Sequence, residues 1–126
     1  MPQTILIVDD EKRLVSLVQS YLMQEGYRVF TAYNGKDALP VAQKEKPDLI
    51  ILDIMMPDLN GIEALKEVSA KKKDTLKKII ITTNASDMEF LSEALELGVS
   101  SYFLKSNMSL ENIFATAEEK VAQVIL

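Results

Sequence analysis

The stretch Leu49-Ile50-Ile51-Leu52-Asp53 consists of four apolar residues without polar alternation, followed at once by an acid. Two more apolar runs of this kind stand at Ile5–Val8 and Ile79–Ile81. Short runs rich in β-branched residues are typical of strands buried on both faces, as in the middle of a parallel sheet. The three runs therefore predict three central strands.

Other segments complete an alternating pattern around these runs. Val29–Ala32 and Ser101–Leu104 are strand-like but mixed in polarity, which is typical of edge strands. Between the runs, apolar residues recur with helical spacing, as at Leu14, Val18 and Tyr21. The sequence predicts strands at about 4–9, 28–32, 48–53, 78–83 and 100–104, and helices at about 11–25, 35–46, 61–71, 87–97 and 109–125.

The order of these elements indicates the fold class. Strands that alternate with helices form parallel sheets through right-handed crossovers. We therefore expect residues 1–126 to form one α/β domain, a doubly wound, flavodoxin-like, five-stranded parallel sheet in the order 2-1-3-4-5 with five helices. In this order a ligand crevice lies at the carboxyl ends of the first and third strands.

Four residues bear on where the helices begin. Asn34, Asp87 and Ser109 stand where a side chain can cap the second, fourth and fifth helices. Pro40 falls well inside the second helix, where proline removes one backbone hydrogen bond and costs about 3 kcal/mol. We therefore expect this helix to begin late or to kink near Gly35–Leu39.

Composition narrows the chemistry open to the chain. It has 126 residues, 48% of them hydrophobic, no cysteine, no histidine and a formal net charge of −5. Disulfides, thiolate or imidazole catalysis and Cys- or His-bound metals are excluded. The negative charge disfavours direct nucleic-acid binding, and no apolar stretch is long enough for a membrane helix. The N-terminal residues lack the pattern of a secretion signal, so we expect a cytoplasmic protein.

Polar residues follow four of the five predicted strands directly. Asp9 and Asp10 come after the first strand, Asp53 ends the third, Thr83 ends the fourth and Lys105 follows the fifth. Because the carboxyl ends of parallel strands meet at one edge of a sheet, we expect these side chains to converge there.

Three carboxylates at one rim repel each other and require a cation. Oxygen ligands without histidine or cysteine favour Mg²⁺ or another divalent ion of the same preference. A lysine and a threonine hydroxyl are suitable partners for a phosphoryl group, and a carboxylate can act as the nucleophile that accepts one. The residues therefore predict metal-assisted phosphoryl chemistry at this rim.

Four segments resemble a known family when they are taken together. They are 7–11 (Ile-Val-Asp-Asp-Glu), 52–61 (Leu-Asp-Ile-Met-Met-Pro-Asp-Leu-Asn-Gly), the Thr83 position and 102–105 (Tyr-Phe-Leu-Lys). In this order, each at a strand end, they resemble the response-regulator receiver domain (CheY-like) of two-component signalling. The resemblance covers the chain from Thr4 to about Val124.

The resemblance implies an acceptor and a metal site. Asp53 would accept a phosphoryl group from a histidine kinase or phosphotransfer protein. Asp10 would bind Mg²⁺ (or Mn²⁺) directly, Asp9 directly or through water, and Asp53 and the Met55 backbone carbonyl would complete the protein ligands. The domain would catalyse its own phosphorylation and dephosphorylation without being a turnover enzyme.

The resemblance also implies a switch. Thr83 would hydrogen-bond the phosphoryl group, Lys105 would pair with it, and Tyr102 would turn inward as Thr83 moves. The face made by helix 87–97, strand 100–104 and helix 109–125 would then change its affinity for an effector protein or domain, or for a second copy of the chain. Direct contact with nucleic acid or membrane is not expected.

Two residues depart from the family pattern. Ser106 stands where proline is common, often after a cis peptide, so Lys105–Ser106 is either trans with an adjusted loop or a strained cis bond. Asn84 stands where a small residue is usual. We expect its amide to slow loss of the phosphoryl group and to restrict access to Asp53.

Other interpretations remain open at this point. Asp9 and Asp10 could belong only to a loop that caps the first helix. A degenerate receiver locked in one state, a small phosphohydrolase with Asp53 as nucleophile and a flavin-binding flavodoxin are alternatives. The phosphohydrolase lacks a second acid near the nucleophile, and a flavin phosphate would meet the acidic segment 9–11. No linker is visible after the last helix, which slightly favours a stand-alone regulator over a domain cut from a longer chain.

Overall fold

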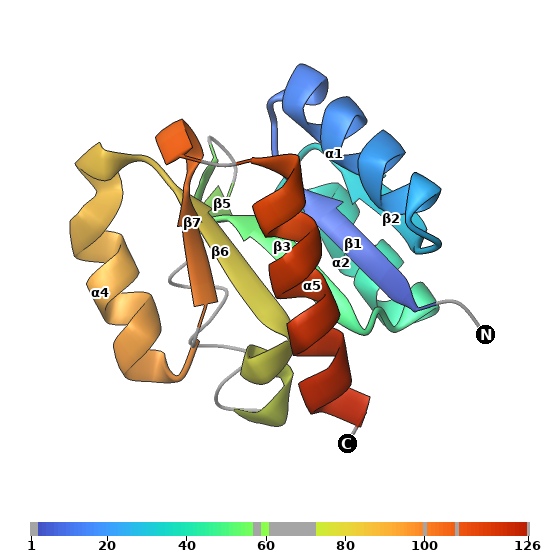
Figure 1. The fold of residues 1–126 in the computed structure, drawn as a ribbon. Helices are drawn as coiled ribbons and strands as arrows, with labels where there is room; N and C mark the ends of the chain where they lie inside the picture. Colours follow the sequence, from blue (N-terminus) through green and yellow to red (C-terminus); the bar gives the residue numbers. More distant parts are fainter. Residues whose placement is uncertain (1–2, 57–58, 61–72, 100, 108, 126) are drawn as a thin grey trace.

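A computed structural model describes residues 3–56, 59–60, 73–99, 101–107 and 109–125. Its main sheet has five parallel strands in the order β2-β1-β3-β6-β7, which confirms the predicted fold class and strand order (Figure 1). The strands are β1 (Thr4–Val8), β2 (Arg28–Ala32), β3 (Leu49–Asp53), β6 (Ile79–Thr83) and β7 (Ser101–Leu104). The two strands predicted to lie at the edges, β2 and β7, do so.

Four helices are described, and they cover both faces of the sheet. They are α1 (Lys12–Gln24), α2 (Gly35–Glu45), α4 (Met88–Leu97) and α5 (Leu110–Ile125). The predicted helix 61–71 lies outside the described residues. Within the described part of the chain, none of the helices combines the length and the apolar character that a membrane crossing requires.

Each central strand contributes to two hydrophobic cores. Ile5 and Ile7 of β1 pack with α1 and α5, whereas Leu6 and Val8 pack on the opposite face with α2 and α4. Successive side chains of a strand point to opposite faces, so a strand covered on both sides needs apolar residues at every position. This is why the strands appear in the sequence as unbroken apolar runs.

Two of the predicted caps are confirmed. Asn34 Oδ1 accepts a hydrogen bond from the backbone N–H of Asp37 at 2.7 Å, and Ser109 Oγ accepts one from Asn112 at 3.2 Å. Such bonds satisfy N–H groups that have no partner inside the helix.

Two expectations about helix starts are corrected. Helix α2 does not begin late: it starts at Gly35, directly after the Asn34 cap, and runs through Pro40. Pro40 is exposed, and the helix is stabilised by the Asn34 cap and by the packing of Ala38, Val41 and Ala42 against the core. Asp87 stands at the start of α4 but makes no capping bond through its side chain, because the 3₁₀ turn η2 (Ala85–Asp87) leads into that helix.

Several short elements were not predicted. Strands β4 (Met55–Met56) and β5 (Leu59–Asn60) form a small antiparallel ribbon, and the 3₁₀ turns η1 (Lys73–Lys78) and η3 (Lys105–Asn107) precede β6 and follow β7. Elements this short carry no hydrophobic period, so the pattern of apolar residues does not reveal them.

Candidate functional site

The carboxyl ends of β1 and β3 place two acidic residues side by side. The two strands pair with Val8 opposite Leu52, and the next residues along the chain are Asp9 and Asp53. The Asp9 N–H donates to the Ala32 carbonyl of β2 at 3.1 Å, which holds the end of β1 against its other neighbour. The position of this acidic pair therefore follows from strand register alone.

Asp10 joins this pair to form an acidic cluster. One carboxylate oxygen from each of Asp9, Asp10 and Asp53 lies within 4.8 Å of the others. Asp9 and Asp53 are buried, with 3% and 5% of their surface exposed, whereas Asp10 is exposed. The expected convergence of these acids is confirmed. The carboxylate that bonds the start of α1 is Asp9, whose Oδ1 accepts from the Glu11 N–H at 2.9 Å.

Lys105 follows the edge strand β7, and its side chain extends from there to this cluster. Its Nζ lies 3.0 Å from Asp9 Oδ2 and 3.0 Å from Asp53 Oδ2. Burial of the ammonium by itself lowers the Lys105 pKa, but the hydrogen bonds that the ammonium donates to Asp53 and Asp9 outweigh burial and raise the pKa above its ordinary value. Lys105 is therefore the charge that compensates the two buried carboxylates.

The backbone around Lys105 resolves one open alternative. The described residues contain no cis peptide bond, so Lys105–Ser106 is trans. The chain turns through η3 at this point, and this turn is the adjusted loop that a trans bond requires.

The donor set suits a divalent cation with a preference for oxygen ligands. Three carboxylates and one ammonium leave a formal charge of −2 at the cluster, which one Mg²⁺ would balance. Oxygen is the only ligand type that the cluster offers, and this is the set that magnesium and manganese accept. The cluster therefore fits the metal that the sequence predicts.

Two threonines end β6, and they differ in their hydrogen bonds. Thr82 pairs in register with Asp53, and Thr83 lies one residue further along. The Thr83 hydroxyl is fully buried and donates to the backbone carbonyl of Asn84 at 3.1 Å. Among the described residues, Thr82 Oγ1 has no hydrogen-bond partner although it is buried. Sequence reasoning did not anticipate this unpaired hydroxyl, because it depends on the packing around β6.

The remaining predicted residues lie around the cluster. Met55 opens β4 two residues after Asp53, so its backbone follows directly from the end of β3. Asn84 is exposed next to Thr83. Tyr102 is 45% exposed on the edge strand β7, so its ring lies outside the core in this structure. The ligand role of the Met55 carbonyl and the switch role of Tyr102 stay predictions.

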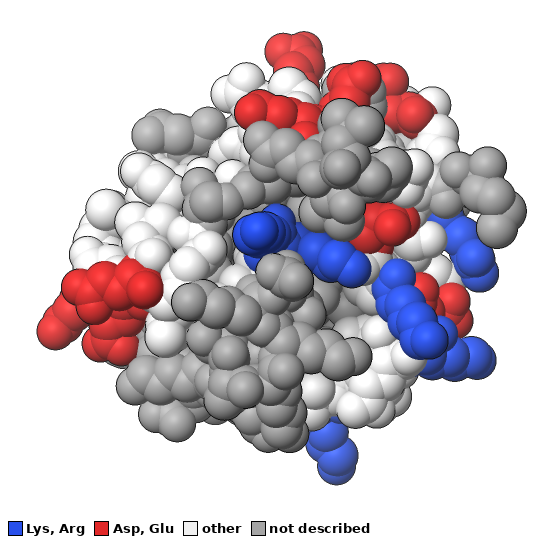
Figure 2. All heavy atoms as spheres, turned by 90° about the horizontal axis from the view of Figure 1, so that it is seen from below, with Lys and Arg blue, Asp and Glu red and all other residues white. Residues whose placement is uncertain are grey.

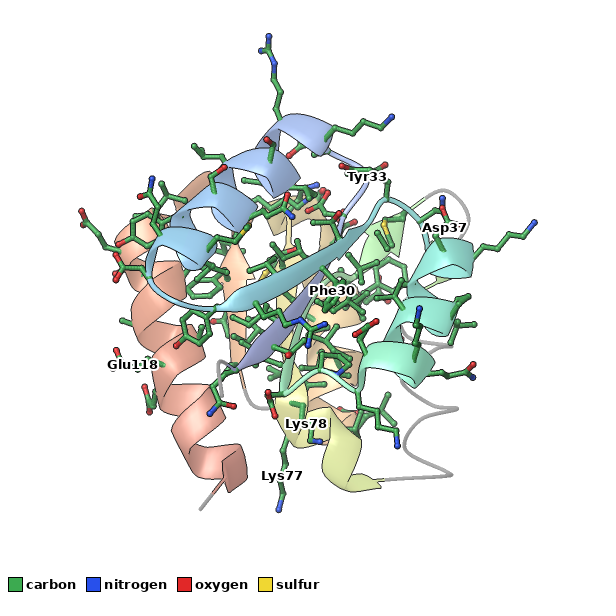
Figure 3. The ribbon with its side chains drawn as sticks, turned by 90° about the vertical axis from the view of Figure 1, so that its right-hand side faces the viewer. Phe30, Tyr33, Asp37, Lys77, Lys78 and Glu118 are labelled. Atoms are coloured by element: carbon green, nitrogen blue, oxygen red, sulfur yellow. The ribbon has the colours of Figure 1, made fainter. Side chains whose placement is uncertain are left out.

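A cation–π pair near the rim was also missed. The Nζ of Lys12, at the start of α1, lies 5.2 Å from the centre of the Tyr33 ring. Figure 3 places Tyr33 just beyond the end of β2. The two residues are far apart in the sequence and share no motif, so only the fold brings them together.

Comparison with known proteins identifies what this fold and rim resemble. Residues 5–118 match the family model described as "Response regulator receiver domain". A curated relative from Bacillus subtilis (strain 168), the "Alkaline phosphatase synthesis transcriptional regulatory protein PhoP", is 45% identical over 106 residues, which are 83% of this chain. The match spans only 43% of that relative's length.

Solved structures agree with the family match. A CheY-like receiver domain protein from Methanospirillum hungatei JF-1 is 26% identical with a TM-score of 0.87, and the match covers 98% of this chain and 97% of that one. The chemotaxis response regulator CheY4 of Vibrio cholerae is 29% identical with a TM-score of 0.82, with 95% and 99% covered.

Proposed function

This chain belongs to the family of response regulator receiver domains, and from that premise we propose that it is a signalling switch that accepts a phosphoryl group on Asp53. Members of this family are signalling modules rather than conventional enzymes. The observation that carries the proposal is the buried Asp53 carboxylate beside Asp9 and Asp10, with the Lys105 ammonium at 3.0 Å. These groups would supply a nucleophile, a metal-binding acid pair and a cation for the incoming charge at one edge of the sheet.

The proposed chemistry is a simple transfer. An Asp53 carboxylate oxygen attacks the phosphorus of a phosphohistidine on a histidine kinase or phosphotransfer protein. The P–N bond breaks as the new O–P bond forms, and the donor imidazole takes up a proton as it leaves. Lys105 already contacts Asp53, so its ammonium can follow the charge onto the phosphoryl oxygens.

Asp9, Asp10, Asp53 and the Met55 backbone carbonyl would hold Mg²⁺ or Mn²⁺. When bound, the ion neutralises charge on the phosphoryl oxygens and so lowers the barrier to in-line transfer. Dephosphorylation would use the same groups, with water in place of the donor. No residue in this cluster is an obvious general base, which is consistent with one transfer per chain rather than repeated turnover.

The proposed readout runs through Thr83 and Tyr102. The Thr83 hydroxyl bonds the Asn84 carbonyl in this structure, and it would exchange that bond for one to the phosphoryl group. Movement of Thr83 would open space behind β6 for the ring of Tyr102, which is now exposed. This is a two-state element biased by one new charge, and it would change how the surface of α4, β7 and α5 binds an effector protein or domain.

The setting of the switch is proposed on the same basis. A kinase or phosphotransfer protein as donor and a cytoplasmic location fit a two-component receiver. The Bacillus subtilis relative is named as a transcriptional regulatory protein, but this chain matches less than half of it, so an output in transcription is only one form that the effector could take.

Intact-mass measurement tests the proposal. Incubation with acetyl phosphate and MgCl₂ should add the mass of one phosphoryl group to the wild type and none to Asp53→Asn. Asp37→Asn is the matched control, because Asp37 is an exposed acid at the start of α2 (Figure 3). Repeated release of phosphate from acetyl phosphate without accumulation of the modified chain would favour the phosphohydrolase. No modification of the wild type would favour a degenerate receiver.

A further inference from the structure

The outer side of α4 carries exposed apolar residues that continue onto β7. Met88 and Leu95 are 42% and 41% exposed, and they stand seven residues apart, on one side of the helix. Tyr102 pairs in register with Ile81, whose side chain packs with Leu91 of α4. Because paired residues of neighbouring strands point to the same face, Tyr102 lies on the α4 side of the sheet. Met88, Leu95 and Tyr102 are therefore exposed apolar residues on the same face of the sheet.

Acidic residues accompany these apolar residues on α4. Glu89, Glu93 and Glu96 are exposed on the outer side of α4 with the spacing of a single helix face. Figure 2 shows carboxylates gathered at the left, where α4 lies in Figure 1. Together with Met88, Leu95 and Tyr102 they form what we call the α4 stripe.

The sequence around the stripe is strongly biased in charge. Residues 85–105, which include α4 and β7, contain four acids and one basic residue. The acids are Asp87, Glu89, Glu93 and Glu96. The one cation, Lys105, points into the acidic cluster at the strand ends and not toward the stripe. No basic side chain of this segment is therefore available to balance the stripe.

We infer that the α4 stripe binds a basic amphipathic segment of a partner protein and not a second copy of this chain. The inference rests on the proposed function, because it names the partner chemistry of the surface that the switch would control. Apolar side chains of the partner would cover Met88, Leu95 and Tyr102, and its lysines or arginines would face the three glutamates.

Symmetry explains why a second copy is disfavoured. A twofold interface places the same patch on both chains, so the glutamates of one α4 would approach those of the other. Like charges brought together at an interface cost free energy, and residues 85–105 offer no lysine or arginine beyond Lys105, which is paired with Asp9 and Asp53. A basic partner converts the same charges into an attraction that weakens with salt.

Titration with synthetic peptides tests the charge half of the inference. The probe is an 18-residue helical peptide of leucine and lysine, and the counter-probe replaces each lysine with glutamate. The variant E89Q/E93Q/E96Q changes the formal net charge from −5 to −2, and so does the control E25Q/E118Q/E119Q, whose residues lie on α5 and at the end of α1. Figure 3 marks Glu118 on α5.

We expect the lysine peptide to bind the wild type and the glutamate peptide to bind far more weakly. The α4 variant should lose about tenfold in affinity for the lysine peptide, the combined effect of three exposed ion pairs, whereas the control variant should lose less than about twofold. Equal losses in the two variants would show attraction by overall charge alone, and this would overturn the inference.

A second pair of variants tests the apolar half. Leu95→Ser removes apolar surface from the stripe, and Leu39→Ser removes it from an exposed position on α2. Both side chains are exposed, so neither change should unfold the protein. We expect Leu95→Ser to lower the affinity for the lysine peptide by about fivefold and Leu39→Ser to leave that affinity unchanged. Equal binding by both variants would overturn the inference.

Sedimentation velocity with acetyl phosphate and MgCl₂ tests whether a second copy of the chain binds the α4 stripe instead. The phosphorylated wild type should remain monomeric at low salt; a dimer at low salt that Leu95→Ser abolishes would overturn the inference. Intact mass of the same sample reports whether Asp53 is modified. If Asp53 stays unmodified, the proposed function fails. Peptide titration of the unmodified chain still tests whether the α4 stripe binds a basic segment.

Discussion

The two halves of the rim at the carboxyl ends of the strands are built in different ways. On the β1–β3 side, Asp9 and Asp53 follow paired residues of neighbouring central strands, so backbone register alone puts their carboxylates together. On the β6–β7 side, the Thr83 hydroxyl is held by a neighbouring carbonyl, and Lys105 reaches the acids only through its long side chain. The first half is set by the sheet, and the second half by side-chain conformation.

Under the proposed function, the two halves of the rim would have separate tasks. A metal-binding and nucleophilic half benefits from fixed geometry, because its oxygens must hold one ion in place. A half that responds to phosphorylation needs contacts that can be exchanged, and the Thr83–Asn84 bond and the two Lys105 ion pairs are contacts of this kind. Changes on each side of the rim should therefore have different consequences, and four experiments measure them.

Replacing Lys105 should have the largest effect on stability. Lys105→Met would leave Asp9 and Asp53 buried without a compensating charge, and removing one partner of a buried ion pair costs about 3–5 kcal/mol. Urea denaturation without divalent cations measures the change in the free energy of unfolding. Lys44→Met, at an exposed position of α2, should change it by less than about 0.5 kcal/mol. Similar losses in the two variants would mean that Lys105 does not balance the acids.

Magnesium should stabilise the acidic half. At a free concentration one hundred times its dissociation constant, a ligand that binds only the folded state adds about 2.7 kcal/mol. Thermal unfolding with and without MgCl₂, at ionic strength matched with NaCl, measures the gain. Asp10→Asn should abolish the gain, and without magnesium it should be neutral or stabilising, because it relieves repulsion within the cluster. An unchanged gain in that variant would exclude Asp10 as a ligand.

Replacing the two adjacent threonines with valine should change the free energy of unfolding in opposite directions. Thr82→Val replaces a buried hydroxyl that has no described partner and should stabilise the fold by about 1 kcal/mol. Thr83→Val breaks the bond to the Asn84 carbonyl and should destabilise by about 1 kcal/mol. Chemical denaturation of the two variants measures these changes. Each variant is the control for the other, because both carry the same Thr→Val substitution. A result of equal sign would show that the two hydroxyls do not differ in this way.

The smallest effect is expected at Asn84. If its amide slows loss of the phosphoryl group, Asn84→Ala should speed autodephosphorylation by about two- to tenfold, the range that one hydrogen bond supports. Decay of the phosphorylated mass after removal of acetyl phosphate gives the rate. Ser86→Ala serves as control, because Ser86 is exposed on the same loop. Fast decay in the wild type that Asn84→Ala leaves unchanged would contradict this role.

Much of the acidic half could be predicted from the sequence. The apolar runs mark the central strands, and a residue that follows such a run lies at the rim in any parallel sheet, which is why Asp9, Asp10 and Asp53 could be grouped. The edge positions of β2 and β7 were predicted from their mixed polarity, and the alternation of strands and helices fitted the strand order; both are confirmed.

The other half could be predicted only in part. The position of Lys105 at a strand end was visible, but its contacts with two acids and the trans bond to Ser106 depend on how η3 turns. The start of α2 at Gly35 despite Pro40 was not predicted, and the contact between Lys12 and Tyr33 depends on where β2 ends.

The sequence by itself determined which segments form the strands and the edge at which the acids gather, and it favoured the sheet order, because hydrophobic period is a local property repeated along the chain. Only the tertiary structure decided which charges are buried, which hydroxyl is paired and which exposed apolar residues of α4 and β7 lie on the same face of the sheet. Those outcomes depend on distances between residues that are far apart in the sequence. Burial without a partner raises the free energy of a charge or a hydroxyl, and the sequence alone does not show which groups are buried.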